Sequence, residues 1–289
     1  MHYKRYKSIL SPHNGMNLYR GCTHGCIYCD SRSVCYQMDH AFEDIEIKED
    51  SAIILEAQLM KKRQKGMIST GSMCDPYIPL EKQLRITRKS LEVIEKHGFG
   101  VTVLTKSATI LSDLDILKRI NEKARTVIQM TLTTADESLC KIIEPYVSTT
   151  LERVNALKTF RDNGINCVVW LDPFLPFIND TETNLRSLLS YCIETGVKGI
   201  IFFGMGLTLR EGNRDYFYQK LDEHFPGLKT KYIETYGNRY EISSPDNERL
   251  SKLFHEICEE HQILHQPNQV FAYLHEFTVK KPYEQLSLF

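Results

Sequence analysis

The sequence predicts an α/β protein built around a parallel β-sheet. From about residue 50 onward, short apolar runs alternate with segments whose apolar residues recur at the spacing of an amphipathic helix. Five of the apolar runs are followed directly by a short polar segment. Strands that alternate with helices of about 10 to 15 residues form βαβ units, which build either a barrel or an open parallel sheet.

The expected elements follow one another in a regular order. The expected strands cover residues 66–70, 101–104, 127–131, 167–171 and 199–203. The expected helices cover residues 81–97 and 113–122, a segment starting at Asp136, and residues 150–163, 181–195 and 245–261. Gly98, Gly164 and Gly196 each follow one of these helices, where glycine readily ends a helix.

The chain is expected to form one main domain over residues 1–206. A C-terminal extension, residues 207–282, is expected to pack on it, and residues 283–289 form a terminal tail. The stretch after Gly206 is rich in tyrosine and charged residues and contains no obvious linker or repeat.

The composition indicates a protein of the cytoplasm. No apolar run approaches the roughly 20 residues that span a bilayer, and no apolar segment follows the basic residues 1–7. The net charge of −1 gives no global attraction to a polyanion. Any nucleic-acid contact would come from local clusters such as Lys4, Arg5 and Lys7 or residues 61–65, and such clusters are more often solvated surface.

The nine cysteines do not indicate a disulfide framework, because their number is odd and no signal peptide precedes them. Four of them crowd into 14 residues: Cys22, Cys26, Cys29 and Cys35. Four others are scattered among apolar neighbours and are interpreted as small buried side chains: Cys140, Cys167, Cys192 and Cys258.

The spacing of Cys22, Cys26 and Cys29 on a glycine-containing loop suits three sulfur ligands to one iron–sulfur cubane. The fourth iron would lack a protein ligand, and an open coordination position is typical of a catalytic metal centre. A zinc site or a four-ligand cluster, completed by Cys35 or His24, remains the alternative.

Polar residues follow the predicted strands at the edge where catalytic groups of parallel βα folds collect. These segments are residues 70–76, 105–107, 131–134, 172–173 and 204–206. Each could be an ordinary polar turn, but five in series favour a shared site.

The C-x3-C-x2-C pattern with Tyr28 before its last cysteine resembles the signature of radical S-adenosylmethionine (SAM) enzymes. The resemblance implies a [4Fe-4S] cluster whose open iron is chelated by SAM. It also implies reductive cleavage of SAM to methionine and a 5'-deoxyadenosyl radical.

A second block, residues 71–81, resembles the spore photoproduct lyase-like branch, also called the DNA repair photolyase group. Further matching positions follow in order over about residues 11–203: Thr105, Lys106, Thr131, Asp136, Glu144, Pro145, Arg153, Pro173 and Pro176. This resemblance implies a partial (β/α)6 barrel of the TIM type.

The resemblance also implies roles for individual residues. The turn with Thr70, Gly71, Ser72 and Asp75 would meet the methionine amino group. Lys106 would meet the SAM carboxylate, although a surface salt bridge is the alternative for this lysine. Thr131 would meet the ribose or the carboxylate, and Arg153 belongs to the same cofactor-binding set.

Cys74, Tyr28 and Tyr77 are candidates for a radical relay, as a hypothesis. Two positions depart from spore photoproduct lyase. Ser72 stands where that enzyme has its hydrogen-donor cysteine, and Asp30 replaces a tyrosine after the third cluster cysteine. Reversal of thymine dimers is therefore not supported.

The last five residues, Gln285, Leu286, Ser287, Leu288 and Phe289, resemble the peptide with which bacterial replication and repair proteins bind the sliding clamp. A hydrophobic end packed on its own domain is the alternative.

The first functional hypothesis is a radical SAM enzyme acting on a nucleic acid, with flavodoxin or ferredoxin as electron donor. The second is a radical SAM enzyme acting on a protein or small metabolite. The third is a non-catalytic iron–sulfur or zinc protein tethered to DNA machinery.

Overall fold

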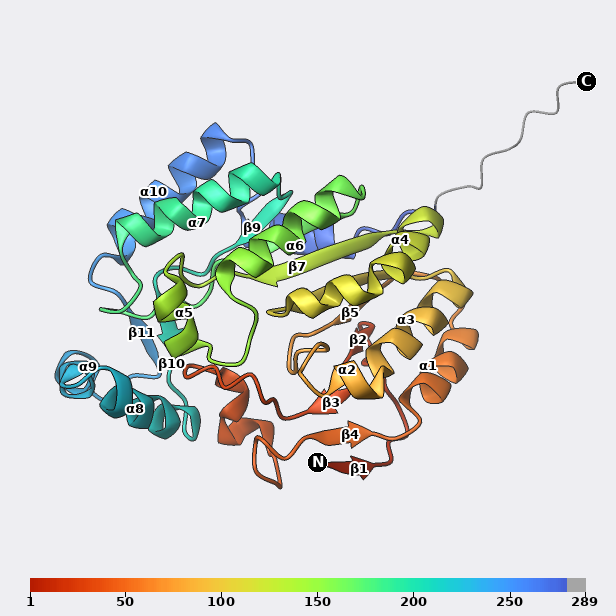
Figure 1. The fold of residues 1–289 in the computed structure, drawn as a ribbon, viewed down its shortest axis with the longest axis horizontal. Helices are drawn as coiled ribbons and strands as arrows, with labels where there is room; N and C mark the ends of the chain where they lie inside the picture. The colour runs from red at the N-terminus through yellow and green to blue at the C-terminus, as the bar shows by residue number, and fades with distance from the viewer. Residues whose placement is uncertain (280–289) are drawn as a thin grey trace, which may run out of the picture.

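The computed structural model describes residues 1–279, and its centre is a six-stranded parallel sheet (Figure 1). The strands are β2 (Gly15–Met16), β5 (Met67–Thr70), β6 (Gly100–Thr105), β7 (Thr126–Thr131), β8 (Asn166–Trp170) and β9 (Gly199–Ile201). Their order in the sheet, β2-β5-β6-β7-β8-β9, is their order in the chain. This order is typical of consecutive βα units in a barrel, and it confirms the predicted parallel α/β fold.

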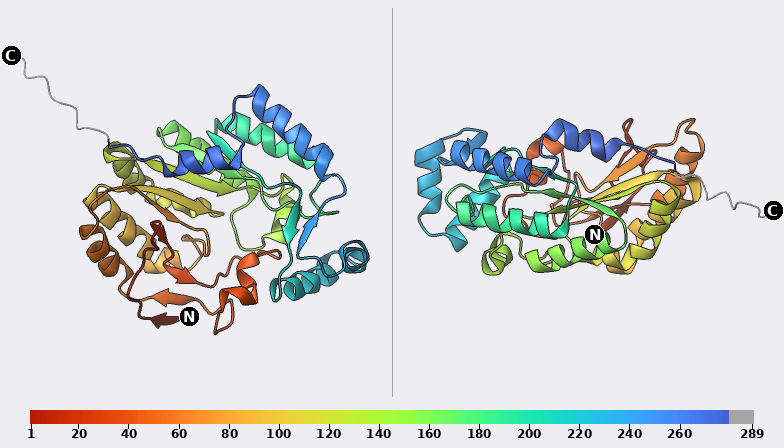
Figure 2. Two further views of the ribbon diagram at one scale, coloured as in Figure 1. Left: turned by 180° about the vertical axis from the view of Figure 1, so that it is seen from behind. Right: turned by 90° about the horizontal axis from the view of Figure 1, so that it is seen from above.

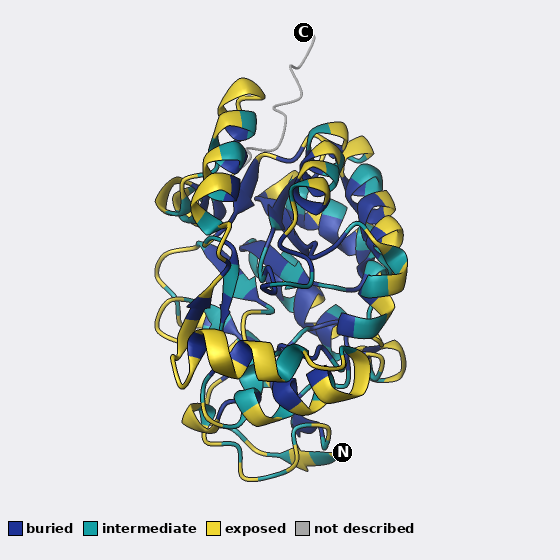
Figure 3. Cartoon of the chain, turned by 90° about the vertical axis from the view of Figure 1, so that its left-hand side faces the viewer, coloured by how far each residue is buried: buried dark blue, intermediate teal, exposed yellow. Residues whose placement is uncertain are grey.

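Helices cover the outer face of the sheet, as Figure 1 shows. The main ones are α1 (Ser51–Met60), α3 (Ile86–His97), α4 (Leu114–Lys123), α6 (Thr150–Asp162) and α7 (Glu182–Thr195). The strand residues between them are buried, whereas the outward helix faces are exposed (Figure 3). This apolar core fixes the strands, so their carboxyl ends meet at one edge of the sheet.

The predicted helix over residues 81–97 is broken into α2 (Glu81–Leu84) and α3, with Arg85 in the left-handed region at φ 54°. The buried Glu81 carboxylate explains the break. It accepts hydrogen bonds from the backbone N–H groups of Thr87 at 2.8 Å and Ile86 at 3.2 Å. These N–H groups belong to the first turn of α3 and would otherwise lack a partner. Glu81 therefore starts a second helix.

A small mixed sheet forms in the N-terminal part of the chain and was not predicted. It contains β1 (His2–Lys4), β4 (Glu46–Lys48) and β3 (Tyr19–Arg20) in the order β1-β4-β3. The strands are only two or three residues long, too short for periodicity to reveal them. Between β3 and β4 the chain forms the cysteine loop and the short helices η1 (Asp30–Arg32) and η2 (Val34–Tyr36).

The C-terminal extension contains more regular structure than expected. It comprises β10 (Gly206–Thr208), α8 (Asn213–His224), α9 (Leu228–Tyr236), β11 (Glu241–Ser243), α10 (Asn247–Glu260) and α11 (Pro267–His275). Strands β10 and β11 pair antiparallel, while α10 packs on α7 and α11 packs on β9. Figure 2 shows α11, in blue, lying across the sheet. Residues 280–289, including the predicted clamp peptide, lie outside the described residues.

Three further short helices complete the outer layer: η3 (Ala108–Asp113), α5 (Glu137–Ile143) and α2. Helix α5 begins at Asp136, whose side chain accepts hydrogen bonds from the N–H groups of Ser138 and Leu139. Within residues 1–279, no helix combines the length and the apolar character that crossing a bilayer requires.

An ion pair between Arg153 and Glu144 is fully buried beneath the carboxyl end of β7. Arg153 also donates to the carbonyl oxygens of Thr131 and Ser148, both at 2.8 Å. The other oxygen of Glu144 accepts the hydroxyl of Tyr28. The pair therefore joins α6, the segment after α5, the end of β7 and the cysteine loop.

Replacing Arg153 by methionine is expected to lower the free energy of unfolding by about 3–5 kcal/mol, because Glu144 would remain as an uncompensated buried charge. Equilibrium urea denaturation under anoxic conditions, followed by circular dichroism, measures the change. The matched control is Lys158→Met on the same helix. Lys158 makes only a surface ion pair with Glu194, so its loss should cost less than about 1 kcal/mol. Equal effects of the two substitutions would contradict the structural role given to Arg153.

Candidate active site

The cysteine loop is held in place by backbone hydrogen bonds on both sides. The N–H of Cys22 donates to the carbonyl of Phe42 at 3.1 Å, and the N–H of Ile27 donates to the carbonyl of Ile143 at 3.0 Å. Gly21 has φ +85°, and a Cβ there would lie 2.4 Å from the Phe42 carbonyl oxygen. Glycine is therefore required for the loop to approach residue 42 so closely.

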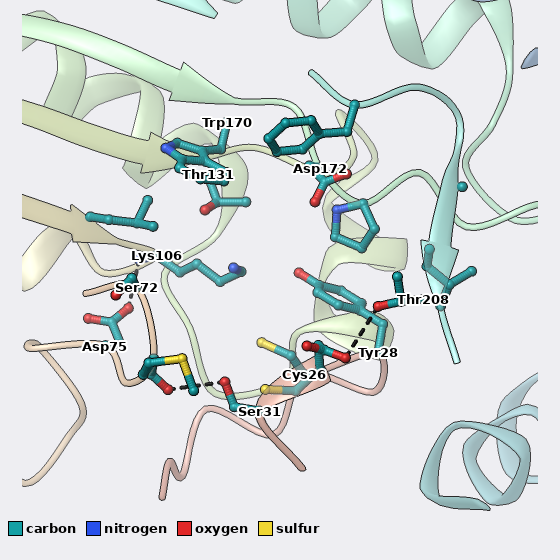
Figure 4. A pocket seen from close by; sticks show the side chains of 18 of the residues that line it. Cys26, Tyr28, Ser31, Ser72, Asp75, Lys106, Thr131, Trp170, Asp172 and Thr208 are labelled. Atoms are coloured by element: carbon teal, nitrogen blue, oxygen red, sulfur yellow. Dashed lines mark hydrogen bonds between the residues drawn. The ribbon is translucent and has the colours of Figure 1, made fainter. Parts of the chain in front are cut away.

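Cys22, Cys26 and Cys29 all line one cavity of about 580 Å³ at the carboxyl ends of the strands. None of the three is in a disulfide. Burial raises the pKa of the Cys22 and Cys26 thiols, so their thiolates need a compensating cation or metal. Figure 4 shows the Cys26 sulfur directed into the cavity. Three cysteine sulfurs outside any disulfide, one buried and two half-buried, beside open volume fit the donor set of an iron–sulfur cluster.

The spacing of the sulfurs does not suit a single zinc ion. In residues 1–279, the three cysteines are not among the groups of ligand atoms that lie within 4.8 Å of one another. The sulfurs of a tetrahedral zinc site are about 3.8 Å apart, given Zn–S bonds of about 2.3 Å. The arrangement is therefore wider than a zinc site and suits a larger cluster.

Both predicted alternatives for a fourth ligand have other contacts. Cys35 is exposed on η2, outside the cavity lining, and its sulfur lies 3.3 Å from a guanidinium nitrogen of Arg210. His24 lines the cavity, but its Nε2 lies 3.1 Å from Asp75 Oδ2 and its Nδ1 lies 3.1 Å from the Tyr146 carbonyl oxygen. Both ring nitrogens of His24 thus lie close to an oxygen atom, although Nε2 does not make a hydrogen bond. The geometry favours three cysteine ligands.

Asp75 ties the cysteine loop to the sheet. Besides His24, its carboxylate accepts the hydroxyl of Thr105 at 2.7 Å and the N–H of Lys106 at 2.8 Å. Burial alone would raise the pKa of Asp75, but the charge of His24 and these hydrogen bonds lower it to about 2. Asp75 lines the cavity as predicted. Its contacts within the protein give it an architectural role that the sequence prediction did not include.

The turn that carries Asp75 is shaped by Gly71, whose φ is +101°. A Cβ at this position would lie 1.9 Å from the carbonyl oxygen of Leu104. The turn after β5 can therefore lie directly against the end of β6 only with glycine at residue 71.

Lys106 extends into the cavity from the end of β6 (Figure 4). Burial alone would lower the pKa of Lys106, but the nearby Cys26 and Glu144 groups raise it overall. Its ammonium lies 5.8 Å from the centre of the Tyr28 ring, and among the described residues it makes no ion pair with a carboxylate. The alternative of a surface salt bridge is therefore wrong. An unpaired, half-buried ammonium suits a carboxylate ligand.

Most of the predicted site residues line this cavity. They are Cys22, Cys26, Cys29, Tyr28, Gly71, Ser72, Cys74, Asp75, Lys106 and Thr131. Cys74 is buried, and its thiol lies 2.9 Å from the Gly21 carbonyl oxygen, so it contacts the cysteine loop directly.

Three predicted residues do not line the cavity. Thr70 is the buried last residue of β5. Tyr77 is buried, and its hydroxyl donates to Asp113 at 3.1 Å. Arg153 is occupied by Glu144 and backbone carbonyls. These side chains support the residues around the site, because the chain turns them into the core rather than toward the opening.

Several lining residues were missed because they come from distant parts of the chain. They are Trp170, Asp172, Phe203, Thr208 and Asn247. Asp172 belongs to one of the predicted strand-end segments but was given no role. No hydrogen bond or ion pair engages its carboxyl group in the described part of the chain. Burial raises the pKa of Asp172 to about 7, although Lys106 acts in the opposite direction.

A parallel barrel edge with three cysteines facing one cavity, an unpaired lysine and open volume fits a metal-dependent enzyme site. The family model of the radical SAM superfamily matches residues 16–189. The chain therefore belongs to the radical SAM superfamily. Its cofactors are a [4Fe-4S] cluster and SAM, and the three cysteines of the loop would hold the cluster.

Relatives with similar sequences carry the name uncharacterized protein. One from Methanocaldococcus jannaschii is 32% identical over 169 residues, which cover 58% of this chain and 62% of that protein. One from Mycobacterium tuberculosis is 26% identical over 227 residues, which cover 76% of this chain and 66% of that protein. The matched segments thus span less than two thirds of either relative.

Solved structures share the fold. A variant of spore photoproduct lyase with bound AdoMet and dinucleoside spore photoproduct has a TM-score of 0.62 at 15% identity, over 86% of this chain and 74% of that one. SuiB of Streptococcus suis bound to SAM has a TM-score of 0.53 at 13% identity, over 91% of this chain and 49% of that one. The predicted partial barrel is confirmed.

Substituting the cluster ligands separates the alternatives for the metal site. Cys22→Ala, Cys26→Ala and Cys29→Ala are each expected to reduce the iron content of anoxically reconstituted protein from about four atoms per chain to less than one. Cys35→Ala is the matched control and should retain about four. Metal analysis and the visible absorption spectrum measure the result. If Cys35→Ala lost as much iron as Cys26→Ala, the three-cysteine site would be wrong.

The raised pKa of Asp172 predicts a pH-dependent stability. The pKa of an aspartate in the unfolded chain is 3.8, whereas burial raises the pKa of Asp172 in the folded chain to about 7. Between these two pH values the folded protein therefore holds a proton that the unfolded chain has lost. Wild-type stability should therefore fall relative to that of Asp172→Asn as pH rises, by at most about 1.4 kcal/mol per unit, and level off above pH 7. Urea denaturation of SAM-free protein between pH 5.5 and 8.5 measures this difference. The exposed control Asp162→Asn should show no such slope, and parallel curves for wild type and Asp172→Asn would refute the prediction.

Proposed function

We propose that this radical SAM enzyme acts on a nucleic acid and that a base enters the open side of the cavity. When bound, the cluster and SAM supply reductive cleavage of SAM to methionine and a 5'-deoxyadenosyl radical. The residues of the chain position the cofactor on one side of the cavity and present the other side to a substrate.

The cofactor side is formed by the cysteine loop and the ends of β5, β6 and β7. Lys106 offers an unpaired ammonium to the SAM carboxylate, while Ser72 and Thr131 offer polar atoms nearby. Tyr28 packs beside Lys106 and is fixed by its hydrogen bond to Glu144. The tyrosine is therefore preorganised and does not need to be ordered when SAM binds.

The observation that carries the substrate proposal is an exposed aromatic ring in the cavity wall. Phe203 lines the cavity, yet it is 59% exposed. Its ring makes an edge contact with Trp170, with 6.1 Å between the ring centres. In Figure 4, Trp170 lies across the cavity from the cysteines. Exposed aromatic rings beside an active site are suited to stacking on nucleobases.

The rim offers further polar groups and one cation. Thr208 and Asn247 reach the cavity from the C-terminal extension. Arg210 follows β10, outside the residues that line the cavity, and its side chain is 32% exposed between the rings of Tyr36 and Tyr240, with its Nε 3.5 Å from the Asp30 carboxylate. A guanidinium near the rim could contact a phosphate group. This local charge supports the proposal despite the net charge of −1.

Action on a protein or small metabolite is the alternative, and it is consistent with the neutral overall charge. The third hypothesis, a non-catalytic metal protein, is wrong because the chain belongs to a family of enzymes.

Two partners are proposed on the sequence alone. Gln285, Leu286, Ser287, Leu288 and Phe289 would bind a sliding clamp, and flavodoxin or ferredoxin would supply the electron. The clamp peptide lies outside the described residues. A clamp partner agrees with a nucleic-acid substrate, because it would hold the enzyme near DNA.

Two substitutions should separate cofactor binding from substrate binding. Lys106→Met should weaken SAM binding by about 10- to 100-fold, because a charge-assisted hydrogen bond is lost. Phe203→Ala should leave SAM affinity unchanged but weaken binding of a single-stranded oligothymidylate by about 5- to 100-fold, as expected for the loss of one stacking ring. Equilibrium binding of each ligand to the cluster-loaded protein measures both effects.

The control for Phe203 is Leu151→Ala, an exposed apolar residue on α6, which should change neither affinity. Wild-type binding of the oligonucleotide should weaken steadily as salt is raised. Binding that is absent, independent of salt or unaffected by Phe203→Ala would contradict a nucleic-acid substrate, while leaving the radical SAM assignment intact.

A further inference from the structure

A second cluster of metal-binding side chains lies on the N-terminal sheet, outside the cavity lining. The register of β1 and β4 places His2 beside Glu46. The segment between η2 and β4 adds Asp39, His40 and Asp44. Two overlapping groups, His2/His40/Asp44 and Asp39/His40/Glu46, each have ligand atoms within 4.8 Å of one another.

Hydrogen bonds fix the orientation of the His2 and His40 rings and the nitrogen that carries the proton in each. His40 Nδ1 lies 3.0 Å from the carbonyl oxygen of Ala41. His2 Nδ1 lies 3.0 Å from Asp44 Oδ2. Because a carbonyl and a carboxylate only accept hydrogen bonds, each Nδ1 carries the proton, and each Nε2 of a neutral ring presents its lone pair. A carboxylate or carbonyl behind the ring is the usual support of a metal-binding histidine.

Both Nε2 atoms face the same oxygen. His2 Nε2 and His40 Nε2 each lie 3.8 Å from Glu46 Oε2, too far for a hydrogen bond. Glu46 is fully buried, and its other oxygen accepts the Tyr6 hydroxyl. Glu46 Oε2 and His40 Nε2 are buried and have no hydrogen-bond partner, although Glu46 Oε2 forms an ion pair with Lys4.

These separations match two ligands of one metal ion. Nitrogen and oxygen ligands at about 2.1 Å from a tetrahedral zinc ion are about 3.4 Å apart, so small side-chain shifts would complete the geometry. Lone pairs that face each other across a buried gap are unfavourable unless a cation lies between them. At present the Lys4 ammonium, 3.0 Å from Glu46 Oε2, supplies the positive charge. Lys4 is 42% exposed, so it can move into solvent when another cation binds.

We propose that Asp39, His40 and Glu46, whose ligand atoms lie within 4.8 Å of one another, bind a divalent transition-metal ion of the zinc class. Imidazole ligands select zinc, nickel or copper over magnesium and calcium, which prefer oxygen. His2, whose Nε2 lies 3.8 Å from Glu46 Oε2, is placed to be a fourth ligand, with Asp44 orienting its ring.

The position of these metal-binding side chains gives the ion a structural role. His40 and Asp44 flank Phe42, whose carbonyl accepts the Cys22 N–H and lies against Gly21. An ion held by Asp39, His40 and Glu46, with His2 as a fourth ligand, would fasten this segment to β1 and β4. Metal binding at the N-terminal sheet would therefore steady the loop that carries the cluster cysteines, without contact with substrate.

Zinc binding to the cluster-loaded enzyme tests the proposal, because the three cysteines are then occupied by iron. After chelator treatment, the holoenzyme should take up one equivalent of zinc in a competition titration. His40→Ala and His2→Ala should weaken binding at least tenfold, since each removes a ligand. His97→Ala is the matched control. His97 contacts only Glu56, at 3.2 Å on another surface, and its loss should change nothing.

Lys4→Met distinguishes a metal site from an ion-pair network. Because it removes the competing ammonium, it should tighten zinc binding. Cobalt(II) in place of zinc should give visible absorption bands that His40→Gln abolishes, and this variant guards against a folding defect of His40→Ala. No zinc uptake, unchanged affinity in both histidine variants, or weaker binding in Lys4→Met would overturn the proposal.

Discussion

The carboxylate of Asp75 is the contact on which the active site depends. It lies at the junction of three segments: the cysteine loop through His24, the turn after β5, and the end of β6 through Thr105 and Lys106. The cysteine loop has no regular secondary structure of its own between β3 and η1. Its position relative to the sheet therefore comes from such contacts, and a buried carboxylate with charged and neutral donors is among the strongest available.

A second buried polar chain supports the opposite side of the loop. Tyr28 donates to Glu144, Glu144 pairs with Arg153, and Arg153 donates to the carbonyl at the end of β7. Burying these charges is costly unless every member is satisfied. The buried hydrogen bonds hold Tyr28, Lys106 and Cys26 around the cavity before any cofactor binds.

Local patterns in the sequence predicted the sheet, the main helices and the cysteine loop that lines the cavity. Apolar periodicity marked β6, β7 and β8, and the polar residues after these strands marked the edge where the site forms. Side-chain interactions over longer range escaped this reasoning. Apolar periodicity predicts one helix over residues 81–97, but the Glu81 carboxylate divides it into α2 and α3. The direction in which Thr70, Tyr77 and Arg153 point depends on packing that spacing alone does not reveal.

The substrate side of the cavity was the hardest part to predict. Trp170, Phe203 and Asn247 come from β8, the segment after β9, and α10, and only the folded chain brings them together. Asp172 followed a predicted strand, but its unpaired state depends on the absence of donors around it. The N-terminal sheet was missed for a related reason, because β1 and β3 are too short to show a period.

The account rests on three cysteines that leave one iron of the cluster open to SAM. Electron paramagnetic resonance of the reduced, cluster-loaded enzyme tests this directly, by comparing the spectrum before and after SAM is added. Coordination of SAM to the open iron predicts a clear change in the g-values. A spectrum that saturating SAM leaves unchanged would show that the fourth iron is not available, and it would contradict the central claim.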